Sequence, residues 1–158
     1  MSSAAPEPAP AAVPTRPLTA QEEAVVRALT HLIHALPRAI DGDMVRERRL
    51  TLTEYLTLMH LSEAPDRRLR MGDLADVCDM SLSGTTRVVH RLESEGFVRR
   101  VRCGEDGRGR HAALTASGLA RLESAWPAHL AAVRRHLLDH LAGLDLRALA
   151  AAFRNIAT

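Results

Sequence analysis

Residues 81–100, SLSGTTRVVHRLESEGFVRR, decide the fold of this chain. Ser81 is a preferred helix N-cap residue, and Gly96 is the residue type that most often follows the last turn of a helix. Between them, three apolar residues at helical spacing supply the buried positions: Val88, Val89 and Leu92. Phe97 then opens a β-like segment that reaches Cys103. The stretch therefore predicts a helix over about 81–95 followed directly by a strand.

A shorter helix and a tight turn precede this stretch. An extended piece at 69–71 leads into a helix over about 72–78, and Asp79 and Met80 form the turn. The inward positions of the short helix are Leu74, Ala75 and Val77. After the strand, the glycine-rich residues 104–110 are typical of a hairpin tip, and residues 111–114 return as a second strand. This order predicts a mainly α winged helix-turn-helix with a small two- to three-stranded β wing over about 97–114.

Two helices are expected before this unit. Thr19 and Glu22 form a capping box at the start of the first. Pro37 is expected to kink or interrupt that helix before it resumes to about position 49, because proline lacks the amide that the helix needs. The second helix begins near residues 51–53 and ends at Ala64-Pro65-Asp66.

Two more helices are expected after the wing. Thr115 opens a long helix, in which Pro127 again predicts a kink or a break. Its apolar face comprises Leu119, Leu122, Trp126, Leu130, Val133, Leu137 and Leu141. After Gly143 a last helix covers about 145–156, with Leu146, Leu149, Phe153 and Ile156 expected to point inward.

The side of helix 81–95 away from its apolar stripe carries small and hydrogen-bonding residues: Ser81, Ser83, Gly84, Thr86, Arg87, His90 and Arg91. A helix fits the major groove of B-DNA, and Arg87 suits a guanine edge there. In the hairpin, Arg108 and Arg110 follow glycines and suit a narrow minor groove. Residues 87–110 hold seven Arg and four acidic residues, a net charge of +3 against +2 for the whole chain. Basic character is therefore concentrated on the expected DNA face.

At these positions the chain resembles the MarR family (multiple antibiotic resistance regulators) over about residues 18–157. The resemblance is carried by Leu52-Thr53-x-Tyr55, Met71-Gly72-Asp73-Leu74-Ala75, Ser83–Arg100, Asp106-Gly107-Arg108, and Leu114-Thr115 with Gly118. Gly107 departs from the family, which has arginine there. The resemblance implies that Arg108 enters the minor groove and that Asp106 supports the wing by pairing with Arg110 or Arg102.

The resemblance also implies a homodimer held by the first and last helices. The expected organisation is a disordered tail over 1–17, a dimerisation helix over 18–49, a DNA-binding domain over 50–114 and dimerisation helices over 115–158. Two recognition helices related by a two-fold axis need half-sites roughly 10 bp apart. We therefore expect a regulator of double-stranded DNA, and a repressor of a pseudo-palindromic operator.

Relatives in this family commonly release DNA when a small molecule binds between the dimerisation helices and the DNA-binding lobe. The resemblance implies a small aromatic or phenolic effector. The candidate ligand-binding residues are His31, His34, Tyr55, Met59 and Arg121.

Composition and motifs exclude several other classes. None of the apolar runs in the 158 residues approaches the ~20 needed to span a bilayer. Two cysteines make no disulfide framework, so a cytoplasmic protein is expected. The sequence has no G-x-S-x-G, no phosphate-cradling glycine loop and no dinucleotide fingerprint. We therefore expect neither an enzyme nor a cofactor.

Three alternatives stay open at this stage. A metal-controlled regulator is the first, because His31/His34 and His136/His140 have the helical spacing that suits two metal ligands. No carboxylate or cysteine accompanies either pair as a third ligand, and there is no H-E-x-x-H motif, so no metal site is predicted. Cys103 beside Arg102 could act as a redox sensor. The third is a winged-helix protein-interaction module that has lost DNA binding, which is favoured by Gly107 in place of the family's arginine.

Overall fold

The computed structural model describes residues 16–102 and 110–156. They belong to two compact units, one up to Ile33 and one from His34 onward. The helix α1 (Ala20–Arg48) begins in the first unit and ends in the second. Its start has the expected capping box, in which the Glu22 N–H donates to the Thr19 hydroxyl at 3.2 Å and the Thr19 N–H donates to the Glu22 carboxylate at 2.7 Å. These bonds satisfy amide groups that the first helical turn leaves without partners.

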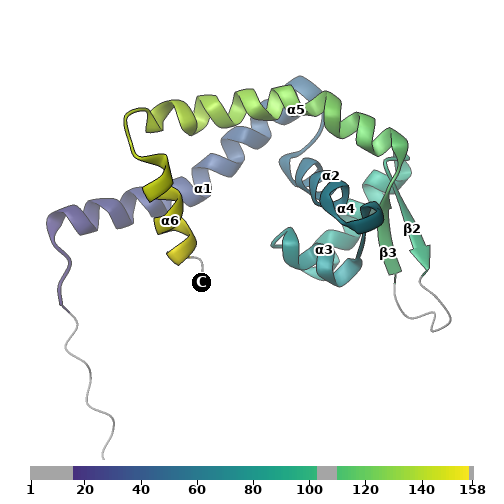
Figure 1. Cartoon of the computed structure of the whole chain (residues 1–158), viewed down its shortest axis with the longest axis horizontal. Helices are drawn as coiled ribbons and strands as arrows, with labels where there is room; N and C mark the ends of the chain where they lie inside the picture. The colour runs from purple at the N-terminus through teal and green to yellow at the C-terminus, as the bar shows by residue number, and fades with distance from the viewer. Residues whose placement is uncertain (1–15, 103–109, 157–158) are drawn as a thin grey trace, which may run out of the picture. The chain divides into compact units, whose positions relative to one another are not determined.

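The second unit contains the winged helix-turn-helix (Figure 1). In chain order its elements after α1 are α2 (Leu52–Glu63), η1 (Pro65–Arg67), β1 (Arg68–Arg70), α3 (Met71–Val77), α4 (Leu82–Ser94), β2 (Val98–Arg102), β3 (Arg110–Leu114), α5 (Ala116–His136), η2 (Leu138–Leu141) and α6 (Leu146–Ile156). The three strands form an antiparallel sheet in the order β1-β3-β2. Leu69 pairs with Ala112, and Val98 pairs with Leu114. The expected fold class is confirmed.

The turn between α3 and α4 and the start of α4 follow the local sequence closely. Asp79 adopts a φ of 51°, a left-handed conformation that aspartate tolerates better than most residues. The Met80 N–H donates to the carbonyl of Ala75 at 2.9 Å and closes the turn. The Ser81 hydroxyl then accepts the N–H of Gly84 at 3.1 Å, as an N-cap should. The expected cap at Ser81 is confirmed.

The sheet is joined to α5 by a close approach of two backbone segments. The Thr115 hydroxyl accepts the N–H of Gly118 at 3.0 Å and lies 2.7 Å from the carbonyl oxygen of Gly96. A Cβ atom on Gly118 would lie 2.0 Å from the carbonyl oxygen of Phe97. Gly118 is therefore required by the packing of α5 against the end of the recognition helix and not by its backbone angles.

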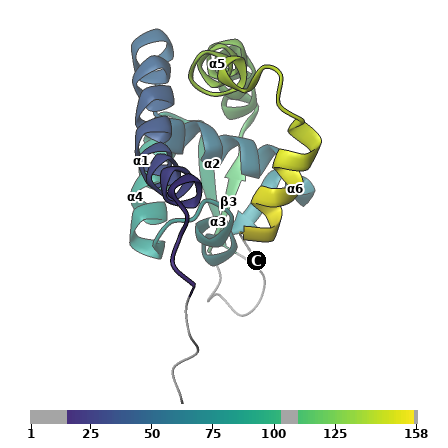
Figure 2. The same cartoon turned by 90° about the vertical axis from the view of Figure 1, so that its left-hand side faces the viewer.

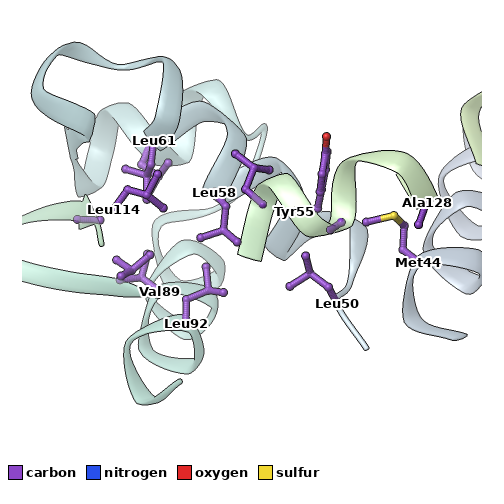
Figure 3. Packing of buried hydrophobic residues seen from close by; sticks show 14 of the residues in the cluster. Met44, Leu50, Tyr55, Leu58, Leu61, Val89, Leu92, Leu114 and Ala128 are labelled. Carbon is purple, nitrogen blue, oxygen red and sulfur yellow. The ribbon is translucent and has the colours of Figure 1, made fainter. Parts of the chain in front are cut away.

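The core is centred on α2, which in Figure 2 lies between α5 above and α3 below. Figure 3 shows Leu58 and Leu61 of α2 facing Val89 and Leu92 of α4, and all four are 0% exposed. At the other end of the cluster, Met44 from the second half of α1 packs beside Ala128 of α5. This packing fixes α4 on the body of the lobe, with its opposite face exposed.

The breaks allowed for at the two prolines do not occur. Pro37 lies inside α1 and Pro127 inside α5, and neither interrupts its helix. Both prolines are exposed, so water can bond the carbonyl groups that lose their amide partner.

Several apolar side chains that were expected to point inward are exposed in the single chain. Val77 at the end of α3 is 49% exposed, and Trp126 of α5 is 52% exposed. The stripe of α6 is also open, since Leu146, Phe153 and Ile156 are 51%, 47% and 70% exposed. The positions of α5 that are buried are instead mostly small: Gly118, Leu122, Ala125, Ala128 and Ala132.

Candidate nucleic-acid interface

The outer face of α4 presents the residues that the sequence singled out. Ser83, Thr86, Arg87 and His90 are exposed. Some of the short side chains are held by the helix itself, because the Thr86 hydroxyl donates to the carbonyl of Leu82 at 2.8 Å. At Gly84 an added Cβ would lie 3.2 Å from the Ser81 hydroxyl oxygen, a tight contact that a small shift of this side chain would have to relieve. The face is therefore low in profile near the N-terminus of α4, with longer side chains one turn later.

The two arginines of this face differ in their surroundings. Arg87 is exposed and makes no hydrogen bond or ion pair with any residue that the structure describes. Arg91, one turn later, lies with its Nε 2.8 Å from the Glu54 carboxylate of α2 and 3.6 Å from the Glu95 carboxylate. The local sequence shows only the weaker of these pairs, because Glu95 follows Arg91 by four positions while Glu54 is 37 positions away.

A third arginine ties the first wing strand to the recognition helix. Arg100 of β2 is an ion-pair partner of Glu93, with Nε and carboxylate 3.3 Å apart, and its guanidinium donates to the carbonyl of Thr86 at 3.3 Å. The Arg100 amide donates to the same carboxylate at 3.1 Å. Arg110 begins β3 and is exposed. Asp106 and Arg108, the other wing candidates, lie outside the described residues.

The candidate ligand residues are only partly brought together. Tyr55 is 0% exposed and stacks on His129 of α5 with ring centroids 4.2 Å apart. Burial, with a smaller contribution from the charge of Glu63, raises the pKa of Tyr55 to about 12, and burial lowers the pKa of His129. Neither the Tyr55 hydroxyl nor the His129 Nδ1 has a hydrogen-bond partner within the described chain. His129 was missed by the sequence analysis, since nothing local shows that it covers Tyr55.

The remaining candidates lie in other surroundings. Met59 is half-buried against the core, and His34 is exposed. Arg121 donates to the carbonyl of Arg48 and lies 5.9 Å from the centre of the Phe97 ring. His31 belongs to the first unit.

A cleft of about 560 Å³ opens beside the recognition helix. Its lining is mainly apolar, with polar groups from α1, the start of α2 and α4: Pro37, Arg38, Asp41, Thr51, Leu52, Thr53, Glu54, Arg87, Val88 and Arg91. Asp41 is engaged there, because it accepts the N–H of Leu52 at 2.8 Å. The cleft therefore includes both exposed arginines of α4.

The metal and redox candidates are placed as follows. His136 lies with its Nε2 2.9 Å from the buried carboxylate of Asp43, and no cluster of three or more metal-ligating side chains occurs among the described residues. Burial raises the pKa of the Cys78 thiol, which lies 4.0 Å from the Thr57 hydroxyl. Cys103 lies outside the described residues. None of the helices in the described ranges combines the length and apolarity needed to cross a membrane.

These features define the class of the protein: a winged helix-turn-helix with a capped, exposed recognition helix and long flanking helices. A family model described as the MarR family matches residues 50–109. AbsC, a MarR family transcriptional regulator from Streptomyces coelicolor, is 37% identical with a TM-score of 0.80, over 90% of this chain and 96% of AbsC. The chain therefore belongs to the MarR family.

Two further relatives match this chain, one over most of its length and one over about half of it. Sco3205, a MarR family transcriptional regulator from Streptomyces coelicolor solved in complex with DNA, is 35% identical with a TM-score of 0.82, over 90% of this chain and 89% of Sco3205. The HTH-type transcriptional repressor YetL of Bacillus subtilis (strain 168) is 34% identical over 86 residues. That match spans 54% of this chain and about half of YetL, 52% of its length.

Proposed function

We propose that this chain is a homodimeric repressor that binds duplex DNA through α4 and releases it when a small molecule binds. The observation that carries the proposal is the exposed face of α4, on which Arg87 has no partner among the described residues while the opposite face is buried in the core. An exposed guanidinium without a protein partner, on a helix that is fixed by the core, is available to bind an acceptor group on DNA. The major groove of B-DNA is wide enough to admit such a helix.

The roles of the individual side chains follow from their positions. Ser83, Gly84 and Thr86 lie near the N-terminus of α4, where small residues allow the helix to approach base edges closely. Arg87 reaches a guanine edge, and His90 lies one turn further along the same face. Arg110 and Arg108 of the wing contact the adjacent backbone and minor groove, where a cationic side chain is attracted by the negative potential.

The relatives support DNA binding and repression. Sco3205 has been solved with DNA, and YetL is named as a repressor. The match to YetL includes only about half of that protein. DNA binding by this chain is therefore argued first from its own recognition helix.

Dimerisation is supported by apolar surface that the single chain leaves open. Leu146, Phe153 and Ile156 of α6 share one exposed stripe, and Trp126 and Leu130 of α5 are 52% and 38% exposed. Exposed large apolar side chains gathered on helix faces mark interaction sites. A second copy of the chain covers these faces and sets two recognition helices at half-sites roughly 10 bp apart.

Release by an effector is supported by unsatisfied polar groups and by the cleft beside α4. The buried Tyr55 hydroxyl and the His129 Nδ1 lack partners in the described chain, which leaves them available to a polar group of a ligand. The cleft beside α4 includes Arg87 and Arg91. A small aromatic or phenolic occupant at either place acts on DNA binding by moving α4 or by engaging its arginines.

The test is fluorescence-anisotropy titration of the full chain with the DNA upstream of its own gene, against a scrambled duplex, over a salt series. We expect selective binding and a log–log salt slope that corresponds to several phosphate contacts. Equal and weak binding to both duplexes, together with no enriched sequence in a genome-wide selection of bound fragments, would contradict DNA recognition and favour a protein-interaction role.

A further inference from the structure

Glu54 is a buried carboxylate that serves two helices at once. It is 3% exposed and belongs to the first turn of α2. Its Oε2 accepts the N–H of Thr51 at 2.8 Å and completes a capping box, since the Thr51 hydroxyl accepts the Glu54 N–H at 3.2 Å. Its Oε1 lies 2.8 Å from the Nε of Arg91 on α4. Both oxygens are therefore committed, one to the α2 cap and one to the recognition helix.

The same contacts continue into α1. Asp41 of α1 accepts the N–H of Leu52, the first residue of α2, at 2.8 Å. A path of contacts thus runs from α1 through the hydrogen bonds at the start of α2 to Glu54, and from Glu54 through an ion pair to Arg91. Because a carboxylate–guanidinium pair is stronger than a neutral hydrogen bond and Glu54 is buried, the last contact holds the last turn of α4 close to α2.

The charge around Arg91 is also unlike that around Arg87. Arg91 has one carboxylate at 2.8 Å and a second, Glu95, at 3.6 Å. Arg87, one helical turn away, has no such neighbour within the residues described. A guanidinium between two carboxylates is attracted to a DNA phosphate much less than a free one.

We propose that Glu54 is a positioning residue that withholds Arg91 from the DNA backbone and braces α4 against α2, so that Arg87 alone of the two arginines contacts DNA. The inference rests on the proposed DNA binding through α4 and deepens it. It gives Glu54 two separable effects: it keeps Arg91 from making a sequence-independent phosphate contact, and it fixes the orientation in which α4 meets the bases. Sequence-independent contacts add affinity without discrimination.

The informative variant is Glu54→Gln. Glutamine is as good as glutamate in the second position of a capping box, so its amide oxygen can keep the bond to Thr51. Glutamine is neutral, however, and its amide nitrogen is a donor, so the ion pair with Arg91 is lost. The substitution therefore releases Arg91 while α2 keeps its cap.

The expected results are measured by anisotropy on selected operator and scrambled duplexes over a salt series. In Glu54→Gln each of the two Arg91 side chains of the dimer gains a phosphate, so the salt slope steepens by about 1.8, twice the value of about 0.9 for one contact. Selectivity for the operator falls, because α4 has lost its brace. In the double variant Glu54→Gln/Arg91→Gln the slope returns to that of the original chain, because the added cation is gone, while selectivity stays low.

Two controls separate this role from simpler ones. Glu95→Gln makes the same change in net charge but leaves the shorter Glu54–Arg91 contact, so its salt slope should steepen much less than that of Glu54→Gln. Urea unfolding of Glu54→Gln, Arg91→Gln and the double variant, without DNA, should give non-additive changes in the free energy of unfolding, as expected for two groups in contact.

The outcomes are distinct. An unchanged slope in Glu54→Gln, an equal steepening in Glu95→Gln, or a steep slope that persists in the double variant would overturn the role of Glu54. An absence of selective binding by the original chain would instead overturn the proposed function and with it any effect on DNA. The unfolding cycle, which needs no DNA, still decides whether Glu54 and Arg91 are coupled.

Discussion

Gly118 is placed where the first turn of α5 passes the backbone at the end of the recognition helix. Its own φ requires no glycine, but a Cβ would lie 2.0 Å from the carbonyl oxygen of Phe97 and 2.8 Å from a methyl carbon of Leu114. The first of these neighbours is backbone that also accepts the Thr115 N–H at 3.0 Å, so it cannot move without breaking that bond.

We expect Gly118→Ala to lower the free energy of unfolding by about 3 kcal/mol, at the upper end of the range for overpacking. Urea denaturation followed by circular dichroism measures the change. Gly72→Ala is the matched control, because a Cβ there meets nothing within 4 Å. Equal stability of the two variants would show that the junction adapts and that the contact is not a constraint.

Arg87 is the residue on which base reading is expected to depend. We expect Arg87→Ala to relax the preference at one base-pair position by roughly 1–3 kcal/mol, because a bidentate contact to guanine is lost. The measurement is binding to a set of operator duplexes, each with one base pair changed. Arg108→Ala, in contrast, should weaken binding to all duplexes and make the salt slope shallower. A uniform loss in Arg87→Ala would assign it to a phosphate instead.

At the scale of the element, the start of α4 depends on a single side chain. The Ser81 hydroxyl is the only side-chain cap of α4 in the described structure, and α3 begins without a side-chain cap. We expect Ser81→Ala to reduce stability by about 1 kcal/mol and to weaken DNA binding, because the first turn of α4 carries the small residues at the interface. Thermal unfolding and anisotropy measure the two effects. Ser124→Ala, at an exposed position inside α5, should change neither.

A second element-scale feature joins the later part of α1 to the end of α5. Asp43 is 5% exposed and lies 2.6 Å from a guanidinium nitrogen of Arg135 and 2.9 Å from the Nε2 of His136, with Arg46 on the same carboxylate. The hydrogen bond from His136, and then the charges of Arg135, Arg46 and His136, outweigh the effect of burial and lower the pKa of Asp43.

The lowered pKa fixes the sign of the pH dependence. A carboxyl whose pKa is lower in the folded state stabilises the fold at pH values above its ordinary pKa of 3.8. That stability is lost as the pH falls through the pKa of the folded state. We therefore expect Asp43→Asn to be destabilised at pH 7 and to lose less stability than the original chain between pH 4 and about pH 2. Urea titrations at several pH values test this. The exposed pair of Asp66 and Arg68, 3.0 Å apart, supplies the control variant Asp66→Asn, which should behave like the original chain.

The parts of the fold that were predicted from the sequence are those fixed by neighbouring residues. The caps at Thr19, Ser81 and Thr115 act within three positions, so the helix starts follow directly from the residues. The breaks allowed for at Pro37 and Pro127 do not occur, because both prolines are exposed and water can bond the carbonyl groups that lose their amide partner. Within the candidate interface, the sequence shows Glu95 four positions after Arg91, but only the fold brings the buried Glu54 to the same arginine.

At the scale of the whole molecule, α6 has an apolar face that the single chain does not bury. Its stripe of Leu146, Leu149, Phe153 and Ile156 follows helical spacing, yet no residue of α6 is buried. An amphipathic helix forms stably only when its apolar face is covered. In a homodimer the partner's helices cover this face, and DNA affinity then depends on it, because a dimer joins two half-site contacts into one binding event.

We expect Phe153→Glu to shift the chain toward monomer and to weaken operator binding at least tenfold, while binding to an isolated half-site changes little. Sedimentation velocity measures the first effect, and anisotropy with full and half operators measures the second. Ala148→Glu introduces the same charge at an exposed position on the opposite side of α6 and should leave the dimer intact. If Phe153→Glu stays dimeric and binds the full operator normally, α6 is not part of the interface. The dimer would then have to be held by the exposed Trp126 and Leu130 of α5 or by α1.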